Sequence, residues 1–316
     1  MPAVLTAAPL PLLRRGATFE IALRGPFDPA ASLEMFRRSG HDLLDCWDGK
    51  TFVRTIVVDG RAIAFSTTFA GTRSRCVVRV IVEDREYTEF IEAAVRGAFV
   101  AAPREFAGLS RIDPLVARLA VRYRGLRPVL QLNVLGALIR CISAQQVNLR
   151  WAAETRRRLA ERFGDRHSVN DEVVYSLSAE RLANASVAEI RALQFTNRKA
   201  EYIIAAAQAT VDGRLSLEHL QALSDDAVIA ELVTLRGIGV WTSEWVLART
   251  LGRPRVVAGD LGVRKAVGIA YGKGAMPSED EVRRLTAHWG ASAAHVQAML
   301  LHALGEKELD TLIAAR

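Results

Sequence analysis

Two short hydrophobic runs, residues 52–58 and 62–68, lie on either side of Asp59-Gly60. Asp-Gly between two such runs is a strong hairpin signal, because both residues tolerate the positive φ angles of a tight turn. A third run, residues 76–82, is rich in valine and predicts another strand. Helices are predicted over residues 28–38 and 87–99. We therefore expect a small antiparallel sheet with helices packed on one face.

After Pro103 the strand signals almost disappear, and helix start and stop signals replace them. Predicted helices include residues 129–143, 149–163, 197–211 and 293–304. Ser186 with Glu189, and Ser278 with Glu281, have the spacing of capping boxes. The expected fold class is α+β: a mixed α/β N-terminal domain over residues 1–105 with an antiparallel sheet, followed by an all-α domain over residues 106–316.

Charge is distributed unevenly between these two parts. Lys and Arg exceed Asp and Glu by 14 to 13 in residues 1–105 and by 28 to 22 in residues 106–316, within a net charge of +7. A basic surface suits a polyanion, so the second part is the better candidate for binding nucleic acid. Most of these basic residues are arginine, which a high-GC genome would also enrich. The arginine content by itself therefore does not distinguish nucleic-acid binding from genome composition.

The three cysteines exclude several classes of protein. Cys46, Cys76 and Cys141 are far apart and odd in number, so neither a disulfide framework nor a metal site is expected. This number and spacing of cysteines fits a reducing cytoplasm.

No run of 18 apolar residues occurs, and no membrane span is expected. Residues 1–13 are apolar but lack a basic start, and we interpret them as a loose terminus, not a signal peptide.

The most informative stretch is Leu235-Arg236-Gly237-Ile238-Gly239-Val240-Trp241-Thr242-Ser243-Glu244-Trp245. Helical patterns at residues 225–234 and 240–250 flank a very short Gly-Ile-Gly turn. Glycines permit positive φ angles and close approach of another backbone, and Ile238 can anchor the turn in the core. Free N–H groups at the start of the second helix would bind a phosphate oxygen without reading sequence. Taken alone, the pattern also fits a tight helical connection without a ligand.

Asp260 follows nineteen residues after Trp241, at the end of the apolar run Val256-Val257-Ala258-Gly259. A helix is predicted directly after it, so the aspartate can be an N-cap and nothing more. It can also present a carboxylate to the same cleft as Trp241 and Trp245, and the two interpretations are compatible. Two tryptophans four residues apart share one helix face, which is as typical of a core as of a pocket.

The hairpin and the aspartate together resemble the helix-hairpin-helix (HhH-GPD) DNA glycosylases, and most closely the 3-methyladenine DNA glycosylase II (AlkA-type) branch. The stretch Ile142-Ser143-Ala144-Gln145-Gln146-Val147 is similar to the glutamine-containing loop of that branch. Residues 104–114 are similar to the start of its helical part. The resemblance covers most of the chain, although only the hairpin and the aspartate are specific.

The resemblance implies a monofunctional glycosylase that flips an alkylated base out of double-stranded DNA and hydrolyses its N-glycosidic bond in base excision repair. Asp260 takes the place of the catalytic aspartate, and Trp241 and Trp245 lie beside the base pocket. Gln146 would fill the gap left by the flipped base, unless it is merely solvated. The residues expected to contact DNA are Gln146, Gly237, Ile238, Gly239, Thr242 and Arg264. No cofactor or metal is implied, and we expect a cytoplasmic, nucleoid-associated monomer of bacterial type.

The chemistry fits these residue types. Breaking the C1′–N bond builds positive charge on the sugar, which a nearby carboxylate stabilises while it orients water. Alkylated purines are cationic, so they leave readily and are attracted to aromatic faces by about 0.5–2 kcal/mol each. Extruding a base costs a few kcal/mol, which a side chain filling the hole offsets in part.

The sequence departs from the family pattern at two positions. Trp241 stands where bifunctional relatives carry the lysine that forms a Schiff base, so strand cleavage is not expected. Gly259 replaces the usual proline before the aspartate, which loosens the backbone there. Glu244 is expected on the surface of the hairpin helix, and Arg264 either contacts phosphate or lies on a solvated helix face. Two alternatives stay open: a glycosylase of the same fold for oxidised or deaminated bases, and a non-catalytic DNA-binding protein.

Overall fold

The computed structural model describes residues 16–38, 40–272 and 274–314. The prediction of a loose terminus over residues 1–13 lies outside the described residues. Within these ranges, no helix is both long and apolar enough to cross a bilayer.

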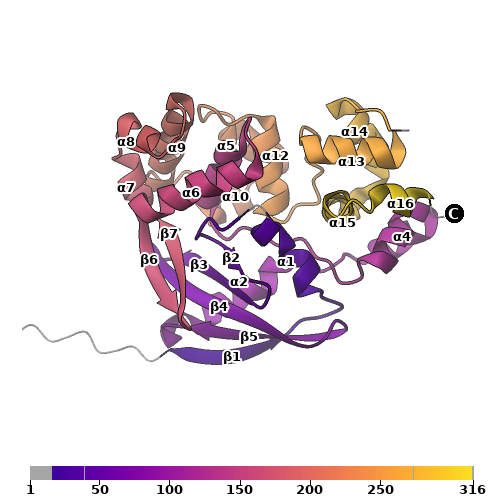
Figure 1. Cartoon of the computed structure of the whole chain (residues 1–316), viewed down its shortest axis with the longest axis horizontal. Helices are drawn as coiled ribbons and strands as arrows, with labels where there is room; N and C mark the ends of the chain where they lie inside the picture. Colours follow the sequence, from indigo (N-terminus) through magenta and orange to yellow (C-terminus); the bar gives the residue numbers. More distant parts are fainter. Residues whose placement is uncertain (1–15, 39, 273, 315–316) are drawn as a thin grey trace, which may run out of the picture.

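The N-terminal part contains a five-stranded antiparallel sheet in the order β1-β5-β4-β3-β2 (Figure 1). The strands are β1 (Ala17–Ala22), β2 (Cys46–Trp47), β3 (Thr51–Val58), β4 (Arg61–Thr72) and β5 (Arg75–Val82). The hairpin at Asp59-Gly60 is confirmed: both residues have positive φ angles, 48° and 74°, and Val58 pairs with Arg61. β1 and β2 were not predicted: β2 is only two residues long, and β1 is held by its pairing with the distant strand β5.

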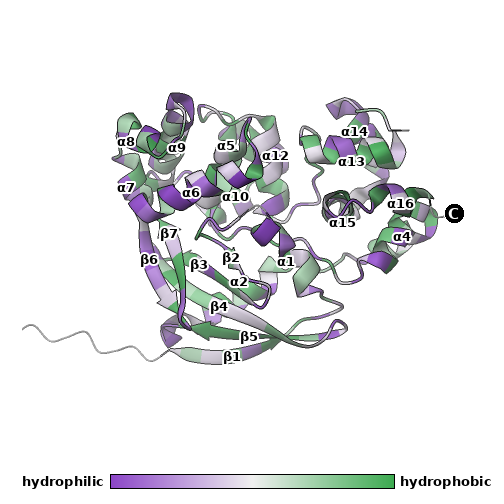
Figure 2. Cartoon of the chain, in the orientation of Figure 1, coloured by the Kyte–Doolittle hydropathy of each residue, from purple (hydrophilic) through white to green (hydrophobic). Residues whose placement is uncertain are grey.

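One face of this sheet carries most of its large hydrophobic side chains. Phe52, Phe65 and Val80 pack there against Leu33 and Ile91, which are fully buried. Leu33 belongs to α1 (Pro29–Arg38) and Ile91 to α2 (Thr88–Ala98), so both predicted helices cover this face. Figure 2 shows the hydrophobic residues gathered along β3, β4 and β5.

The rest of the chain is mostly helical and has two cores. The first is formed by α5 to α12 and the second by α3, α4 and α13 to α16, so the chain leaves the second group after α4 and returns to it after α12. The helices of the first group are α5 (Val134–Ala144), α6 (Leu149–Phe163), α7 (Ala179–Ala183), α8 (Val187–Ala192), α9 (Asn197–Val211), α10 (Leu217–Ala222), α11 (Asp225–Leu232) and α12 (Val240–Arg249). Those of the second are α3 (Phe106–Ile112), α4 (Pro114–Arg122), α13 (Leu261–Tyr271), α14 (Glu279–Thr286), α15 (Ala293–Gly305) and α16 (Leu309–Ala314).

Local signals placed most of these helices correctly. Both predicted capping boxes form, at Ser186 and at Ser278. The α+β class is confirmed, with the antiparallel sheet first and the helical part after it. α5 begins at Val134, five residues later than predicted, because the Asn133 side chain accepts the N–H of Gly136 and caps the helix there. The boundary between residues 105 and 106 stays a prediction.

The expectation that residues 106–316 are all-α was wrong. A hairpin of β6 (Gly164–Val169) and β7 (Glu172–Leu177) follows α6, with Asn170 and Asp171 at positive φ angles in its turn. Val169 and Val174 pack against Val53 and Ala64 on the face of the sheet that α1 and α2 leave open. The hairpin forms because it covers this second face, a long-range contact that the local pattern around Gly164 does not reveal.

A buried ion-pair network joins the two parts of the chain. Asp42, from the loop after α1, pairs with Arg156 of α6 at 2.9 Å and with Arg140 of α5 at 3.0 Å. Asp45 pairs with Arg140 at 2.9 Å and with Arg54 of β3 at 2.6 Å. Burial raises the pKa of Asp42, but the two arginines and its hydrogen bonds outweigh it and hold the pKa at about 2.

Asp42→Asn should lower the free energy of unfolding at pH 7 by about 3–5 kcal/mol, because it leaves buried arginine charge uncompensated. Since the pKa of Asp42 is lowered by folding, from 3.8 to about 2, its stabilising contribution is complete above about pH 4 and is lost as the pH falls toward 2. Urea unfolding from pH 7 to pH 2 measures both effects, and the variant should lack this part of the acid dependence.

The matched control is Glu20→Gln, which breaks the exposed Glu20–Arg79 pair between β1 and β5. Its effect should stay below about 1 kcal/mol. Equal losses in the two variants would show that the Asp42 network does not hold the two parts together.

Candidate active site

The predicted helix-hairpin-helix is formed by α11, α12 and the turn between them. Gly237 has a φ angle of +83°, and a side chain built there would overlap the ring of Tyr202 from α9. Ile238 is buried and closes the turn through its N–H to the carbonyl of Leu235 at 3.0 Å. Arg236 pairs with Glu201 of α9 at 2.8 Å. The corner is therefore fixed from behind by α9, which the sequence did not indicate.

The first turn of α12 offers backbone donors that have no partner among the described residues. Gly239 caps the helix without a side chain, and the first intrahelical bond is donated by Ser243 to Gly239 at 3.1 Å. The N–H groups of Val240, Trp241 and Thr242 precede that bond, and Gly239 and Val240 are exposed. An exposed helix N-terminus of this kind favours an anion.

The Thr242 side chain is only 1% exposed inside the helix packing, and the expected DNA contact of this residue stays a prediction. A contact from this position is limited to its backbone N–H. Glu244 was misplaced: it is 1% exposed instead of lying on the surface. The pattern of polar residues along α12 misled here because α12 is covered on most of its circumference by neighbouring elements.

Trp241 and Trp245 lie on α12 and are both partly exposed, so neither is a core residue. The Cβ of Trp241 lies close to Gly259: a side chain built on that glycine would approach it to 3.4 Å. This places Trp241 directly beside the segment that leads to Asp260.

Asp260 is the N-cap of α13, and its Oδ1 accepts the N–H of Val263 at 3.0 Å. Its side chain is partly exposed and forms no ion pair within the described residues. The negative charge of Asp260 acts on two neighbouring groups. Burial lowers the pKa of the Arg249 guanidinium and the Asp260 charge offsets part of this, while burial raises the pKa of the Cys141 thiol and the Asp260 charge adds to the rise. Asp260 is therefore close to α5 and to the end of α12.

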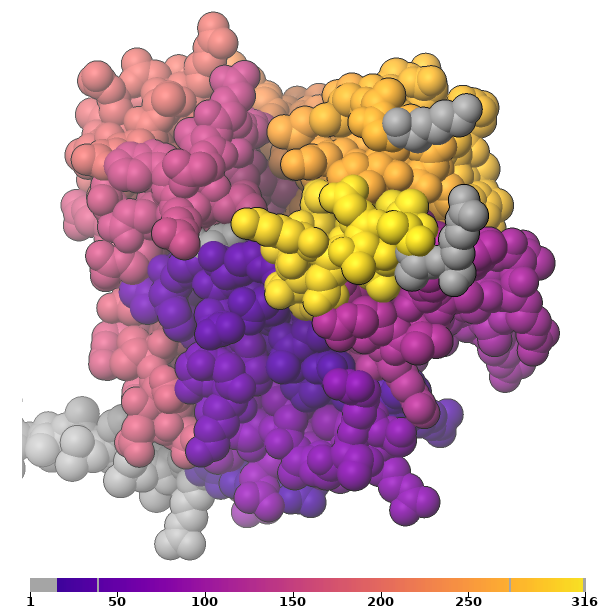
Figure 3. All heavy atoms as spheres, turned by 45° about the vertical axis from the view of Figure 1, so that its right-hand side comes forward, coloured from indigo at the N-terminus to yellow at the C-terminus, as the bar shows by residue number. Residues whose placement is uncertain are grey.

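The site lies where the two helical cores meet. Ile238 and Val246 belong to the first core, and Ala258 and Val263 to the second. Figure 3 shows an indentation of the surface between the lobe around α6 and the lobe of α13 and α14. The sequence motifs thus come together at a boundary between packed bodies, which is a common place for a ligand site.

Gln146 lies in the loop between α5 and α6, exposed and with a φ angle of +56°. A non-glycine residue in this region is strained, and such strain is typical of functional positions. The preceding Gln145 donates from Nε2 to the carbonyl of Gly237 at 3.2 Å. Ser143, in the last turn of α5 before this loop, accepts from Arg156 at 2.8 Å through its hydroxyl and from the Lys199 amine at 2.9 Å through its carbonyl. The loop is therefore attached directly to the hairpin.

Arg264 is partly buried, and its Nε donates to the carbonyl of Pro277 at 2.9 Å. This contact holds the segment after α13, a structural role that the sequence did not suggest. In the described part of the chain, no cluster of His, Cys, Asp or Glu has the arrangement of a metal site.

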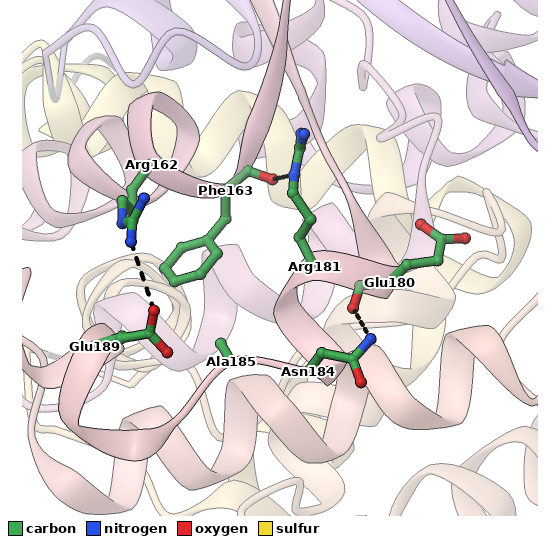
Figure 4. A pocket seen from close by; sticks show the side chains of 7 residues that line it. All are labelled: Arg162, Phe163, Glu180, Arg181, Asn184, Ala185 and Glu189. Atoms are coloured by element: carbon green, nitrogen blue, oxygen red, sulfur yellow. Dashed lines mark hydrogen bonds and ion pairs between the residues drawn. The ribbon is translucent and has the colours of Figure 1, made fainter.

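A cavity of about 300 Å³ lies elsewhere, at the ends of α6, α7 and α8 (Figure 4). Phe163 and Ala185 lie between two ion-paired arginines in its lining: Arg162 pairs with Glu189 and Arg181 with Asp165. It shares no residue with the hairpin, the tryptophans or Asp260. Nothing about it indicates the chemistry that those residues suggest.

Residues 139–291 match the model of a family described as "HhH-GPD superfamily base excision DNA repair protein". Two Bacillus subtilis (strain 168) proteins are similar to this chain. One, named "Putative DNA-3-methyladenine glycosylase YfjP", is 32% identical over 51% of the chain, and the other, named "DNA-3-methyladenine glycosylase", is 29% identical over 58%. The matches span 55% and 61% of those relatives' own lengths. The solved structure of a 3-methyladenine DNA glycosylase from Archaeoglobus fulgidus has the same fold, with a TM-score of 0.81, 24% identity and coverage of 94% of this chain and 100% of that one.

Gly237→Ala should lower the free energy of unfolding by about 1–3 kcal/mol and weaken duplex binding, because the new methyl group meets Tyr202 at a φ angle that disfavours it. Gly239→Ala is the matched control two residues away. It has a φ angle of −111° and nothing within 4 Å of an added Cβ, so its stability should fall by less than about 1 kcal/mol, the cost of alanine at an N-cap. Chemical denaturation of both variants tests this, and equal stability would show that Tyr202 does not constrain the corner.

Proposed function

We propose, from the match of residues 139–291 to the model of the HhH-GPD superfamily, that the protein is a monofunctional DNA glycosylase that excises alkylated bases of the 3-methyladenine type from duplex DNA. The observation that carries the proposal is the proximity of two features, since Trp241 in the first turn of α12 lies against Gly259, the residue before Asp260. One is the amide groups at the start of α12, and the other is the partly exposed Asp260 carboxylate, which forms no ion pair within the described residues.

DNA would be held through its backbone. The exposed amides after Gly239 suit a phosphate oxygen, and a contact of this kind carries no sequence information. Gln146, on its strained and anchored loop, would enter the duplex where the target nucleotide has left. The names of the Bacillus subtilis relatives support an alkylated base as the substrate.

Asp260 would stabilise the developing positive charge at C1′ as the bond to the base breaks and its electron pair leaves with the base. Water then forms the new bond to C1′, and its proton passes to the carboxylate. Oδ1 accepts a hydrogen bond from the N–H of Val263. This bond would fix the rotation of the carboxylate and leave Oδ2 for the sugar and the water.

The partly exposed rings of Trp241 and Trp245 would bind the flipped base. A cationic alkylated purine gains about 0.5–2 kcal/mol from each suitable aromatic face, which favours it over an undamaged base. Trp241 offers no amine for a Schiff base, and this supports hydrolysis without strand cleavage.

Asp260→Asn should abolish base release, with a loss of at least about 10²–10³-fold, yet leave duplex binding intact. Asparagine is as good an N-cap as aspartate, so α13 stays capped and only the charge is lost. Chromatography of bases released from methylated duplex DNA measures the effect.

Asp226→Asn, the same exchange at an exposed position of α11, should release bases at the wild-type rate. Normal release by Asp260→Asn would refute the assignment, and an enzyme–DNA adduct trapped by borohydride would refute monofunctional chemistry.

Gln146→Gly should slow base release from duplex DNA by about ten-fold, because the unstacking cost of a few kcal/mol is no longer offset. Release from single-stranded DNA should not change. Gln194→Gly is the control, since Gln194 is also exposed and has a φ angle of +72°, but lies at the end of α8. Equal rates for the two variants on duplex DNA would contradict a wedge role for Gln146.

A further inference from the structure

The segment that leads into Asp260 has no strand partner in the described part of the chain, although its residues are apolar. Val257 and Ala258 are buried, so their N–H groups need acceptors. Two side chains supply them: Gln297 of α15 accepts from Val257 at 2.8 Å, and Glu244 of α12 accepts from Ala258 at 3.2 Å. The path of the backbone before Asp260 is therefore set by two buried side chains from different helices.

Glu244 has both carboxylate oxygens occupied. Oε2 accepts from Ala258, while Oε1 lies 3.2 Å from Nη2 of Arg283 and 3.6 Å from Nε of Arg255. With 1% exposure it has no access to a substrate. Its charge instead joins three elements: α12, the segment before Asp260, and α14, which carries Arg283.

We call Glu244, Arg283 and the Ala258 N–H group the clamp. Gly259, a flexible residue, lies between the clamp and Asp260. A glycine restricts its neighbours least of all residues, so the direction of the next side chain depends on contacts around it. Those contacts are close on both sides, because a Cβ at Gly259 would lie 3.2 Å from Oε1 of Glu279 and 3.4 Å from Cβ of Trp241. Arg283 also pairs with Glu279 at 3.5 Å, so it helps to hold one of the two side chains that lie close to Gly259.

We propose that Glu244 is a positioning residue that, by holding the Ala258 amide and Arg283 together, fixes where the Asp260 carboxylate meets the sugar. The inference rests on the proposed function, in which Asp260 acts at C1′. Displacement of a reacting group by about 1 Å costs on the order of 10²-fold, so a loosened segment is enough to impair catalysis without unfolding the site.

The test compares binding of two duplexes, one with a cationic pyrrolidine and one with a neutral tetrahydrofuran in place of the target nucleotide. A well-placed Asp260 favours the cation, so wild type should bind the pyrrolidine duplex more tightly. Glu244→Gln and Arg283→Gln should each reduce this preference by about 10-fold or more, with binding to the neutral duplex unchanged. Arg283 is partly exposed, so its variant should fold even if Glu244→Gln is unstable.

Arg284→Gln is the matched control, because it removes the same charge from the adjacent, exposed position of α14 and should keep the preference.

A purely electrostatic effect would change the preference in opposite directions: loss of Glu244 would weaken binding of the cation, and loss of Arg283 would strengthen it. Opposite signs, or an unchanged preference in both variants, would overturn the proposal. No preference in wild type would refute the role of Asp260 itself, whereas a preference abolished by Asp260→Asn but not by the clamp variants would refute only the role of Glu244.

Discussion

The ring of Tyr202 lies against the α-carbon of Gly237, at a point where the backbone turns with a φ angle of +83°. This contact fixes the corner between α11 and α12, and the direction of α12 follows from it. Because α12 carries Trp241, Glu244 and Trp245, one glycine determines where an aromatic surface and a buried carboxylate are placed. A larger residue at that corner would move α9 and α12 apart, and all the later geometry would shift with them.

Asp260 and Glu244 show how environment separates two carboxylates of similar chemistry. Asp260 begins a helix at the surface, with one oxygen engaged by a backbone amide and no ion pair among the described residues. Glu244 is buried, with an arginine within 3.2 Å and an amide on its other oxygen. The first keeps one oxygen for the role proposed for it, and both oxygens of the second are engaged inside the protein. Because both side chains are carboxylates, the difference between them comes from their different burial.

The N-terminal sheet contributes through the network around Asp42. Arg156 pairs with Asp42 and also donates to the Ser143 hydroxyl, at the end of the helix that leads to Gln146. Lys199 donates to the carbonyl of the same serine, and Gln145 reaches the hairpin at Gly237. The loop with the strained Gln146 is thus held from the sheet on one side and from the hairpin on the other. A rigid support of this kind suits the role proposed for Gln146, which is to enter a duplex against the stacking energy of the bases.

The sequence by itself determined the elements whose causes are local. The Asp59-Gly60 hairpin, both capping boxes, the Gly-Ile-Gly turn and the N-cap at Asp260 all form as predicted, because each depends on contacts between residues close in the chain. The resemblance to the glycosylase family rested on the same short motifs. Only the tertiary structure decided which polar residues of α12 are buried, that β6 and β7 cover the open face of the sheet, that Tyr202 supports the corner and that Arg264 holds Pro277. These depend on surfaces brought together from distant parts of the chain, and their partners share no spacing along the sequence that a local pattern can record.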